Sequence, residues 1–238
     1  MKKLRVATHN ICHTGFDPRD GSELFPDHSY RNGYEAEAVR MMKKSWNDVY
    51  ASFSADVIGV QEYYPWFDLA HTEKTDGIFA AFGYSVHDGG HGLALASKLR
   101  AEKVYELSFE PVSGRRRQKF YIDAFGTRIA VFNSHMSPRA ADADKRRLER
   151  ELLIEEMKQE EYFVSFGDYN ARNTEEYGIF AEEGFPMANT GIATVRGSKA
   201  VCDNVIVSRG LRIENVAVFD AGFSLSDHAV LYAELIVP

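Results

Sequence analysis

Residues 162–170 read Tyr162-Phe163-Val164-Ser165-Phe166-Gly167-Asp168-Tyr169-Asn170. The first five residues are apolar or small and predict a buried strand. The strand runs into a carboxylate and an amide, at Asp168 and Asn170, and sheets commonly present their active sites at such strand ends. Gly, Asp and Asn are also turn formers, so an ordinary turn explains this segment equally well when it is taken alone.

The same arrangement of an apolar strand followed by polar side chains recurs outward along the chain. Residues 4–9 alternate with the period of a half-buried strand that ends at Asn10, and the apolar run 57–60 stops at Glu62. The remaining predicted strands cover residues 92–96, 104–109, 119–125, 128–135, 201–207 and 229–237. The polar residues collected from strand ends are Asn10, Glu62, Asn133, His135, Asp168, Asn170, Asp203, Asp227 and His228.

Two helices are predicted from apolar residues that recur every three or four positions. The first covers residues 35–53. The second covers residues 139–159, and the residues expected to point inward from it are Leu148, Leu152, Leu153 and Met157. Helices that separate groups of strands agree with an α/β fold.

The chain has 238 residues, of which 45% are hydrophobic and 26% are charged. This length and hydrophobic content are enough to form a substantial buried core. The formal charge of −7 excludes a strongly basic nucleic-acid coat. No apolar run approaches the about 20 residues that cross a bilayer, and no apolar leader follows Met1. Cys12 and Cys202 are too few for a disulfide framework, so we predict reduced thiols. We expect a single domain over residues 1–238 and a cytoplasmic monomer.

The ligand types at the strand ends favour Mg²⁺ or Mn²⁺ as a cofactor, because these cations prefer hard oxygen ligands. Two histidines without a close cysteine cluster are a poor match for structural zinc. Hydrolysis of a phosphate ester needs an in-line water, neutralised equatorial oxygens and a stabilised leaving oxygen. A divalent cation, a base and hydrogen-bond donors meet these needs, and no side chain has to become a covalent nucleophile.

Six short motifs span residues 8–228. They are Thr8-His9-Asn10, Gln61-Glu62, Asn133-Ser134-His135, Gly167-Asp168-Tyr169-Asn170, the run 202–208 and Ser226-Asp227-His228. In this order they resemble the endonuclease/exonuclease/phosphatase superfamily, which includes DNase-I-like nucleases, abasic-site endonucleases, inositol phosphatases and neutral sphingomyelinases. The resemblance implies an α/β fold, a four-layer α/β/β/α sandwich with two mostly antiparallel sheets packed face to face and helices outside.

The resemblance also implies a role for each matching carboxylate and amide. Glu62 would be the main metal carboxylate, helped by Asn10. Asp168 would orient or deprotonate the attacking water. Asn170 would hold that water or a phosphate oxygen, and Asp203 would help to position metal or phosphate.

The histidines, by the same resemblance, would act on the phosphoryl group. His228, oriented by Asp227, would stabilise charge on the phosphoryl oxygens or act as a general acid/base. His135 would donate to a phosphate oxygen and Asn133 would support it. A contact between Asp227 and His228 needs a non-strand backbone at that turn, because neighbours in a strand point to opposite faces.

Three departures from the family pattern bear on the substrate. The central hairpin motif often contains Gly-Asn, whereas this chain has Gly92-Leu93. The aromatic residue that usually follows the Asp of the fifth motif is Asn204 here. Residues 171–202 contain no Trp, whereas the abasic-site enzymes tend to have a Trp-rich loop there, which argues against a close DNA-repair relative.

The densest basic cluster lies at residues 113–119, Ser-Gly-Arg-Arg-Arg-Gln-Lys. A solvated hairpin tip would explain it, and so would a clamp for an anionic substrate, because Arg matches the geometry of phosphate. In the second interpretation Arg115 and Arg116 contact the substrate phosphate. A separate hypothesis is that oxidation of Cys12 or Cys202 affects activity, because each lies within two residues of a predicted site residue.

The leading hypothesis is a Mg²⁺-dependent phosphoester hydrolase, most specifically a phosphodiesterase that acts on a small or lipid-like substrate by metal-assisted in-line attack of water. The acidic charge favours such a substrate over nucleic acid. The second hypothesis is a DNA or RNA nuclease that uses the basic cluster. The third is a catalytically silent binding module, against which the intact carboxylates and histidines argue, because fold stability alone does not require that set.

Overall fold

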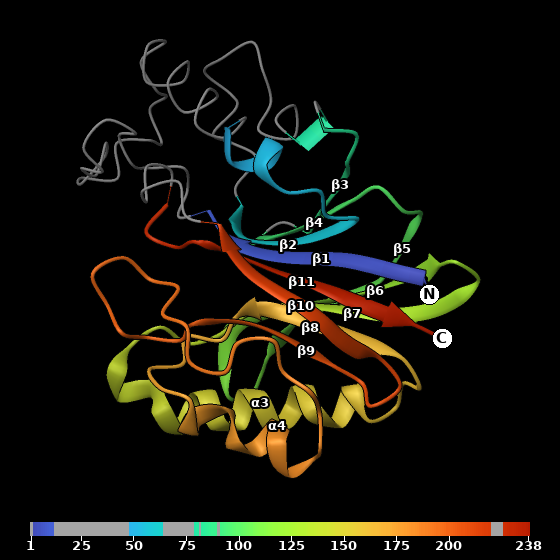
Figure 1. Cartoon of the computed structure of the whole chain (residues 1–238). Coiled ribbons are helices and arrows are strands. Elements are labelled where there is room, and N and C mark those ends of the chain that lie inside the picture. The colour runs from blue at the N-terminus through green and yellow to red at the C-terminus, as the bar shows by residue number, and fades with distance from the viewer. Residues whose placement is uncertain (1, 12–47, 64–78, 81, 90, 220–225) are drawn as a thin grey trace.

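A computed structural model of the chain describes residues 2–11, 48–63, 79–80, 82–89, 91–219 and 226–238. Within these residues two sheets pack face to face (Figure 1). The first has six strands in the order β10-β11-β1-β2-β4-β3, and the second has five in the order β5-β6-β7-β8-β9. Helical segments pack on the outer face of each sheet. The predicted four-layer α/β sandwich is therefore confirmed.

The six-stranded sheet joins the first and the last strand of the chain. Its strands are β1 (Lys2–Asn10), β2 (Val57–Tyr63), β3 (Ser85–Asp88), β4 (Gly92–Ser97), β10 (Arg212–Phe219) and β11 (Val230–Val237). β1 pairs antiparallel with β11, from Lys2 opposite Val237 to Thr8 opposite Leu231, and parallel with β2. The sequence patterns miss β3, which has four residues, and β10, whose side chains are mostly exposed or half-buried.

The five-stranded sheet contains the middle of the chain. Its strands are β5 (Ala101–Phe109), β6 (Ser113–Ala124), β7 (Thr127–His135), β8 (Phe163–Asp168) and β9 (Asp203–Val207). A hairpin turn at residues 125–127 joins β6 to β7, and Gly126 has the positive φ of 89° that this turn needs. The turn between β5 and β6 covers residues 110–112, so the basic cluster 113–119 belongs to β6 and does not form the hairpin tip.

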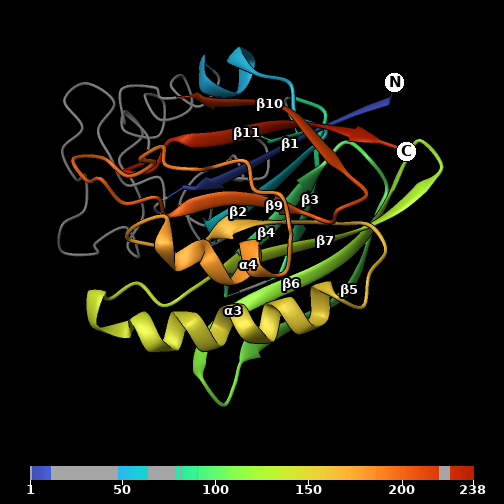
Figure 2. The same cartoon turned by 60° about the horizontal axis from the view of Figure 1, so that its bottom comes forward.

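Short and long helical segments cover the outer face of the five-stranded sheet (Figure 2). They are η4 (Ala140–Asp142), α3 (Ala143–Met157), η5 (Glu175–Tyr177) and α4 (Gly178–Glu182). On the opposite side residues 48–52 are helical, and residues 35–47 of the first predicted helix lie outside the described residues. No helix that the structure describes has the length and apolar character of a membrane span.

The prediction of an inward Leu148 on α3 is wrong, because its side chain is 39% exposed. The inner face of the helix carries Leu153 and Met157 as predicted, but one turn earlier it buries Arg146, Glu149 and Arg150. Charged residues can occupy that face because each finds an ion-pair or hydrogen-bond partner, which a count of apolar positions cannot anticipate.

The space between the sheets is filled by apolar side chains from both, and Asn133 is a buried polar exception. The Asn133 amide nitrogen donates to the backbone oxygens of Val60 (3.2 Å) and Ala94 (2.9 Å) in the opposite sheet. Its amide oxygen accepts a hydrogen bond from Gln61 at 2.7 Å. Asn133 has no exposed surface and cross-links the two sheets, so any support that it gives to His135 acts through the position of β7.

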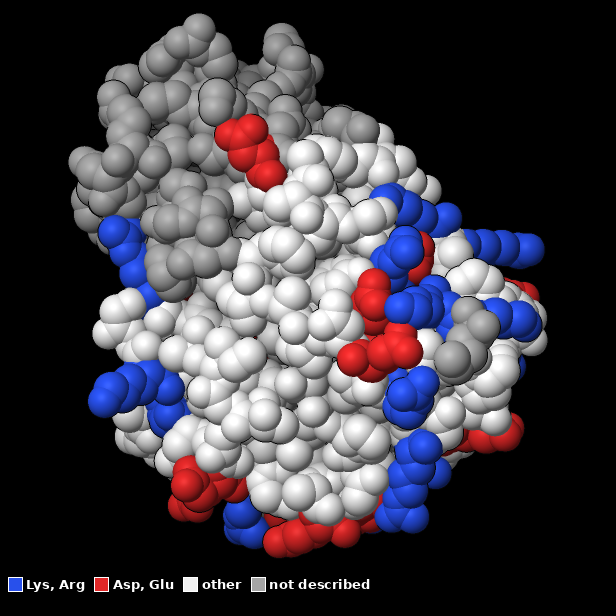
Figure 3. Space-filling model, viewed as in Figure 1, with Lys and Arg blue, Asp and Glu red and all other residues white. Residues whose placement is uncertain are grey.

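Positive and negative side chains are intermixed on the face seen in Figure 3. One group lies on the outer face of the six-stranded sheet, where Lys3 is 2.7 Å from Glu214 and 3.2 Å from Glu234, and Arg5 is 3.7 Å from Glu234. These ion pairs divide the charge of this face into small opposite patches. Among the described residues of this face, the paired charges therefore largely cancel one another.

Candidate active site

The candidate site is built where strands from both sheets end together. Within the described residues each sheet has one parallel pair, β1–β2 and β7–β8. Parallel strands that pair in register end at the same level. Asn10 is opposite Gln61 in the first pair, and His135 is opposite Asp168 in the second. In this way the two pairs bring polar side chains to one edge of the sandwich.

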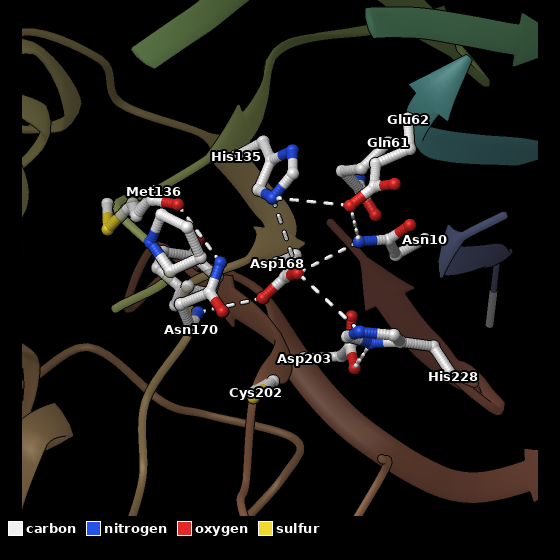
Figure 4. Close-up of polar contacts among 12 residues, drawn as sticks. Asn10, Gln61, Glu62, His135, Met136, Asp168, Asn170, Cys202, Asp203 and His228 are labelled. Atoms are coloured by element: carbon white, nitrogen blue, oxygen red, sulfur yellow. Dashed lines mark hydrogen bonds and ion pairs between the residues drawn. The ribbon is translucent and has the colours of Figure 1, made fainter. Parts of the chain in front are cut away.

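Two further strands begin at this edge. Asp203 opens β9 directly opposite Asp168, in antiparallel register. His228 precedes β11, whose pairing with β1 brings it beside Asn10. Figure 4 shows the side chains of Asn10, Glu62, His135, Asp168, Asp203 and His228 pointing toward one another. We call these six residues the site cluster.

Glu62 enters the cluster through an irregularity in β2. The register with β4 shifts between Gln61 and Tyr63, and Glu62 has a left-handed backbone with φ 56°. Gln61 points between the sheets, where it bonds to Asn133, so strict alternation would place Glu62 on the outer face of the sheet and away from the site. Tyr63, after the irregularity, packs on that outer face. The bulge re-aims the side chain, at the cost of a backbone conformation that non-glycine residues rarely adopt.

Asp168 lies at the centre of the hydrogen bonds in Figure 4. Its Oδ2 accepts a hydrogen bond from the Asn10 amide at 3.0 Å, and its Oδ1 accepts one from the backbone N–H of Asn170 at 2.8 Å. The Nε2 atoms of His135 and His228 lie 3.6 and 3.7 Å from Oδ2. The Asn10 amide also donates to Glu62 at 3.2 Å, so it links two carboxylates.

The loop after Asp168 is held from β7. The Asn170 side-chain amide donates to the backbone oxygen of Met136 at 3.0 Å, and Gly167 packs so closely on β7 that a Cβ would lie 2.1 Å from the Ser134 oxygen. One of the two amide protons of Asn170 is thus used within the protein. Its second amide proton and its amide oxygen remain, among the described residues, for the water or phosphate oxygen that the resemblance implied.

Asp203, and not Asp227, hydrogen-bonds the His228 ring. His228 Nδ1 lies 2.7 Å from Asp203 Oδ2, whereas Asp227 Oδ1 is 4.0 Å from the other ring nitrogen. The prediction that Asp227 orients His228 is therefore wrong. The antiparallel register of β8 and β9 brings Asp203 to the ring, although the two residues are 25 positions apart in the sequence.

The two histidines of the cluster have opposite protonation preferences. Burial disfavours the charged form of His228, but the charges of Asp203 and Asp168 outweigh it and raise its pKa to about 10. Burial lowers the pKa of His135, although Asp168 and Glu62 oppose this shift. Burial also raises the pKa of Asp168. At neutral pH, His228 is therefore an imidazolium and His135 a neutral ring.

The donor set of the cluster fits a divalent cation. The carboxylates of Glu62, Asp168 and Asp203 outnumber the imidazolium of His228, and a cation would neutralise the excess. One atom each of Asp168, Asp203 and His228 lies within 4.8 Å of the others. The His228 imidazolium has no lone pair for a metal, so the oxygen ligands of Glu62 and Asn10 would hold Mg²⁺ or Mn²⁺. The Glu62 side chain is 23% exposed, so part of it is accessible from solvent.

The basic cluster divides into two parts. Arg117 and Lys119 are buried in ion pairs with Glu156 (2.7 Å) and Glu160 (2.6 Å) and are not available to a substrate. Arg116 is opposite His135 in the β6–β7 pair. Arg115 lies close enough to His135 for its charge to add to the lowering of the His135 pKa by burial.

Three supporting residues near the cluster were not predicted. The Ser226 hydroxyl donates to the backbone oxygen of Asn10 at 2.6 Å and accepts a hydrogen bond from the backbone N–H of His228 at 3.0 Å. His9 bonds to the Tyr50 hydroxyl at 2.9 Å, and burial and the charge of His228 lower its pKa to about 3. Thr194 donates to Asp203 at 2.6 Å. The signal available for Ser226 was its place in the last motif, whereas nothing in the sequence indicates Thr194.

A second group of charged residues lies on α3 and η5, and we call it the α3 cluster. It contains the buried Arg146, Glu149 and Arg150 and the half-buried Glu176. Arg146 binds both Glu176 oxygens, at 2.9 and 3.1 Å, and Arg150 binds the same carboxylate at 2.9 Å. Glu149 accepts hydrogen bonds from Ser137, at 3.0 Å from the N–H and 2.6 Å from the hydroxyl. Arg150 also donates to the backbone oxygen of Tyr169 at 3.3 Å. The α3 cluster therefore holds the loops after His135 and Asp168.

Cys202 is buried, and its thiol contacts only the Ala171 oxygen, at 3.6 Å, among the polar groups of the described residues. Burial raises the thiol pKa, which keeps it protonated and unreactive. The structure therefore argues against oxidation of this residue. Cys12 lies outside the described residues.

Comparisons with known proteins agree with this geometry. The model of the Endonuclease/Exonuclease/phosphatase family matches residues 15–228. A search of curated proteins found no match. Similar solved structures include D. rerio TDP2 with a single-strand DNA product (14% identity, 99% of each chain, TM-score 0.69). The human Nocturnin catalytic domain with sulfate is 15% identical over 100% of this chain and 94% of that one, with a TM-score of 0.69.

ANGEL2, described as a 2′,3′-cyclic phosphatase, is a further similar structure, solved with adenosine-2′,3′-vanadate (15% identity, 98% of this chain and 95% of that chain, TM-score 0.68). At such low identity these structures establish the fold alone. The family match covers most of the chain and includes five of the six sequence motifs. The chain belongs to the Endonuclease/Exonuclease/phosphatase family.

Proposed function

We propose that the protein is a divalent-metal-dependent phosphoester hydrolase, and more specifically a phosphodiesterase that directs water in line at phosphorus. The observation that carries this proposal is the position of Asp168, a buried carboxylate between the Nε2 atoms of His135 and His228. The solved structures with a DNA product, a sulfate and an adenosine vanadate support it, because each ligand carries or imitates a phosphoryl group.

Asp168 is the base in this proposal. Burial raises its pKa, which makes the carboxylate a better proton acceptor than an exposed aspartate. The hydrogen bonds from Asn10 and from the Asn170 backbone hold both of its oxygens in place. A water beside Oδ2 would give its proton to Asp168 while its oxygen bonds to phosphorus and the ester oxygen leaves.

His228 and His135 act on the phosphoryl oxygens. Nδ1 of His228 is bound to Asp203, so Nε2–H of the imidazolium is directed toward the space beside Asp168. There it would stabilise the charge that develops on the phosphoryl oxygens or protonate the leaving oxygen. His135, a neutral ring, would donate one hydrogen bond to the same group. When bound at Glu62 and Asn10, Mg²⁺ or Mn²⁺ would neutralise phosphoryl charge as a Lewis acid.

The proposal is tested by hydrolysis of a panel with Mg²⁺, Mn²⁺ or chelator. The panel contains a chromogenic phosphodiester, its monoester, plasmid DNA, a sphingomyelin analogue and an inositol polyphosphate. We expect turnover of the diester that chelator abolishes and that His228→Ala lowers about 100-fold or more. Turnover of the monoester alone would contradict the phosphodiesterase. No turnover of any member, with no metal bound, would favour a silent binding module.

The second candidate is a nuclease, favoured by the position of the basic residues at the end of β6, where Arg116 is opposite His135 in the β6–β7 pair. The double variant Arg115→Gln/Arg116→Gln tests it, because Arg117 and Lys119 are already paired with carboxylates. A nuclease would lose DNA cleavage about 10-fold or more in this variant while small-diester turnover stays unchanged. Arg147→Gln, an exposed arginine on α3, is the matched control for lost positive charge.

A further inference from the structure

Asp203 uses only one of its two carboxylate oxygens. Oδ2 accepts hydrogen bonds from the Thr194 hydroxyl at 2.6 Å and from His228 Nδ1 at 2.7 Å. Oδ1 is buried and accepts no hydrogen bond from any residue that the structure describes. If one of the two donors were lost, the carboxylate could rotate and present Oδ1 in place of Oδ2 to the remaining donor. Both hydrogen bonds are therefore needed to fix its orientation.

The Thr194 hydroxyl has a fixed direction. Its oxygen accepts the backbone N–H of Asp203 at 3.2 Å, so its single proton is left for Asp203 Oδ2 at 2.6 Å. Thr194 and Asp203 both have no exposed surface. Water therefore cannot replace the hydroxyl, and loss of this donor would leave the buried carboxylate with His228 alone.

The backbone of Thr194 holds the other side of the same pair. Its carbonyl accepts the N–H of Ala229, the residue after His228, at 2.9 Å, and the neighbouring Val195 bridges to His228 itself. One residue thus contacts Asp203 through its hydroxyl and the His228 segment through its carbonyl. These two contacts set the distance between the carboxylate and the imidazole.

We propose that Thr194 is a positioning residue that locks Asp203 Oδ2 onto His228 Nδ1 and so directs His228 Nε2 at the substrate. Its effect on turnover rests on the proposed phosphodiesterase. The proposal about the geometry of the pair does not, because the hydrogen bond exists without substrate. Thr194 does not touch the reacting atoms.

The experiment compares Thr194→Val, which keeps the shape and the backbone contacts but removes the hydroxyl, with Thr194→Ser, which keeps the hydroxyl. The first readout is the downfield proton resonance of the His228 Nδ1–H bond in histidine-labelled protein, assigned by its loss in His228→Gln. The second is kcat and KM for the chromogenic diester. Thr194→Ala serves in place of Thr194→Val if the latter does not fold.

We expect Thr194→Val to shift or broaden the His228 proton and to lower kcat about 10-fold with KM within about twofold. Thr194→Ser is expected to restore both. An unmoved proton and unchanged kcat in Thr194→Val overturn the proposal, as does a Ser variant that behaves like Val. If the wild type hydrolyses no diester, the proposed function fails while the proton resonance still decides the role of Thr194.

Discussion

The chain buries charged side chains in two neighbouring places, and the two groups differ in how their charges are balanced. In the α3 cluster Glu176 accepts hydrogen bonds from both Arg146 and Arg150, and Glu149 accepts them from Ser137. In the site cluster three carboxylates share one imidazolium, and an oxygen of Asp203 is left without a donor among the described residues. Arg150 Nε in the α3 cluster likewise has no partner among the described residues, so the clusters differ in charge balance: the site cluster alone has an excess of carboxylates.

The comparison separates what holds the site from what performs chemistry in it. The α3 cluster grips the loops at Ser137 and Tyr169, directly after β7 and β8. Substituting one member of the α3 cluster should destabilise the fold around these loops, because a buried charge would lose its partner. Removing a carboxylate from the site cluster relieves repulsion instead, so it should abolish activity and leave the fold intact.

The largest expected effect is on catalysis. Asp168→Asn should lower kcat for the diester by about 10³-fold, because the amide cannot accept the proton of the attacking water. The variant should keep the circular dichroism spectrum of the wild type. Asp144→Asn, an exposed aspartate at the start of α3, is the matched control and should retain full kcat. A kcat for Asp168→Asn near the wild-type value would remove Asp168 as the base.

The next effect is on stability. Arg146→Met should lower the free energy of unfolding by about 3 kcal/mol, because the Glu176 carboxylate loses its bidentate hydrogen bonds to the Arg146 guanidinium. Arg147→Met, the exposed neighbour whose side chain pairs only with Glu151 among the described residues, should change it by less than about 0.5 kcal/mol. Urea denaturation measures both. Equal losses for the two variants would mean that the α3 cluster does not support the fold.

Metal binding should distinguish the clusters by a smaller shift. At about 100 times its dissociation constant, Mg²⁺ should stabilise the wild type by about 2.7 kcal/mol, or raise Tm by about 5 to 10 °C. Glu62→Gln should lose this increase, whereas Arg146→Met should retain it at a lower starting Tm. Differential scanning calorimetry gives both values. A full increase in Glu62→Gln would place the cation elsewhere.

The smallest effect is a pH dependence of the α3 cluster. Burial opposes ionisation of Glu176, but hydrogen bonds from Arg146, the Arg172 N–H and Arg150 outweigh it and lower its pKa to about 2. Because this lies below the unfolded value of about 4.3, the contribution of Glu176 to stability is complete above that pH and is lost toward pH 2. The Tm difference between wild type and Glu176→Gln should therefore close over this range. A difference that stays constant down to pH 2 would falsify the assignment.

Much of the site could be predicted because apolar strands that stop at polar residues are visible in the sequence. Asn10, His135 and Asp168 come together for this reason, through the two parallel pairs. The direction of Glu62 could not be predicted, because strict alternation points it away from the site and only the bulge at φ 56° reverses this.

Contacts between residues distant in the sequence determine the features that the sequence patterns missed. Adjacency in the sequence favoured Asp227 as the partner of His228, whereas the pairing of β8 with β9 supplies Asp203. An apolar count favoured Leu148 as an inward residue, whereas ion pairing buries Arg146 and Arg150 on that face. In both cases the deciding partner is distant in the sequence, so no local pattern carries the signal.

The pairing of β1 with β11 has a consequence for the order of events during synthesis. β1 is an inner strand whose neighbours are β2 and β11, and β11 is translated more than 200 residues after it. Contacts so distant in sequence make folding slow, because a long loop must close before they form. Ser226, which joins Asn10 to His228, must also wait for this closure. A nascent chain still on the ribosome therefore has its carboxylates, but the site cluster can assemble only after β11 has emerged.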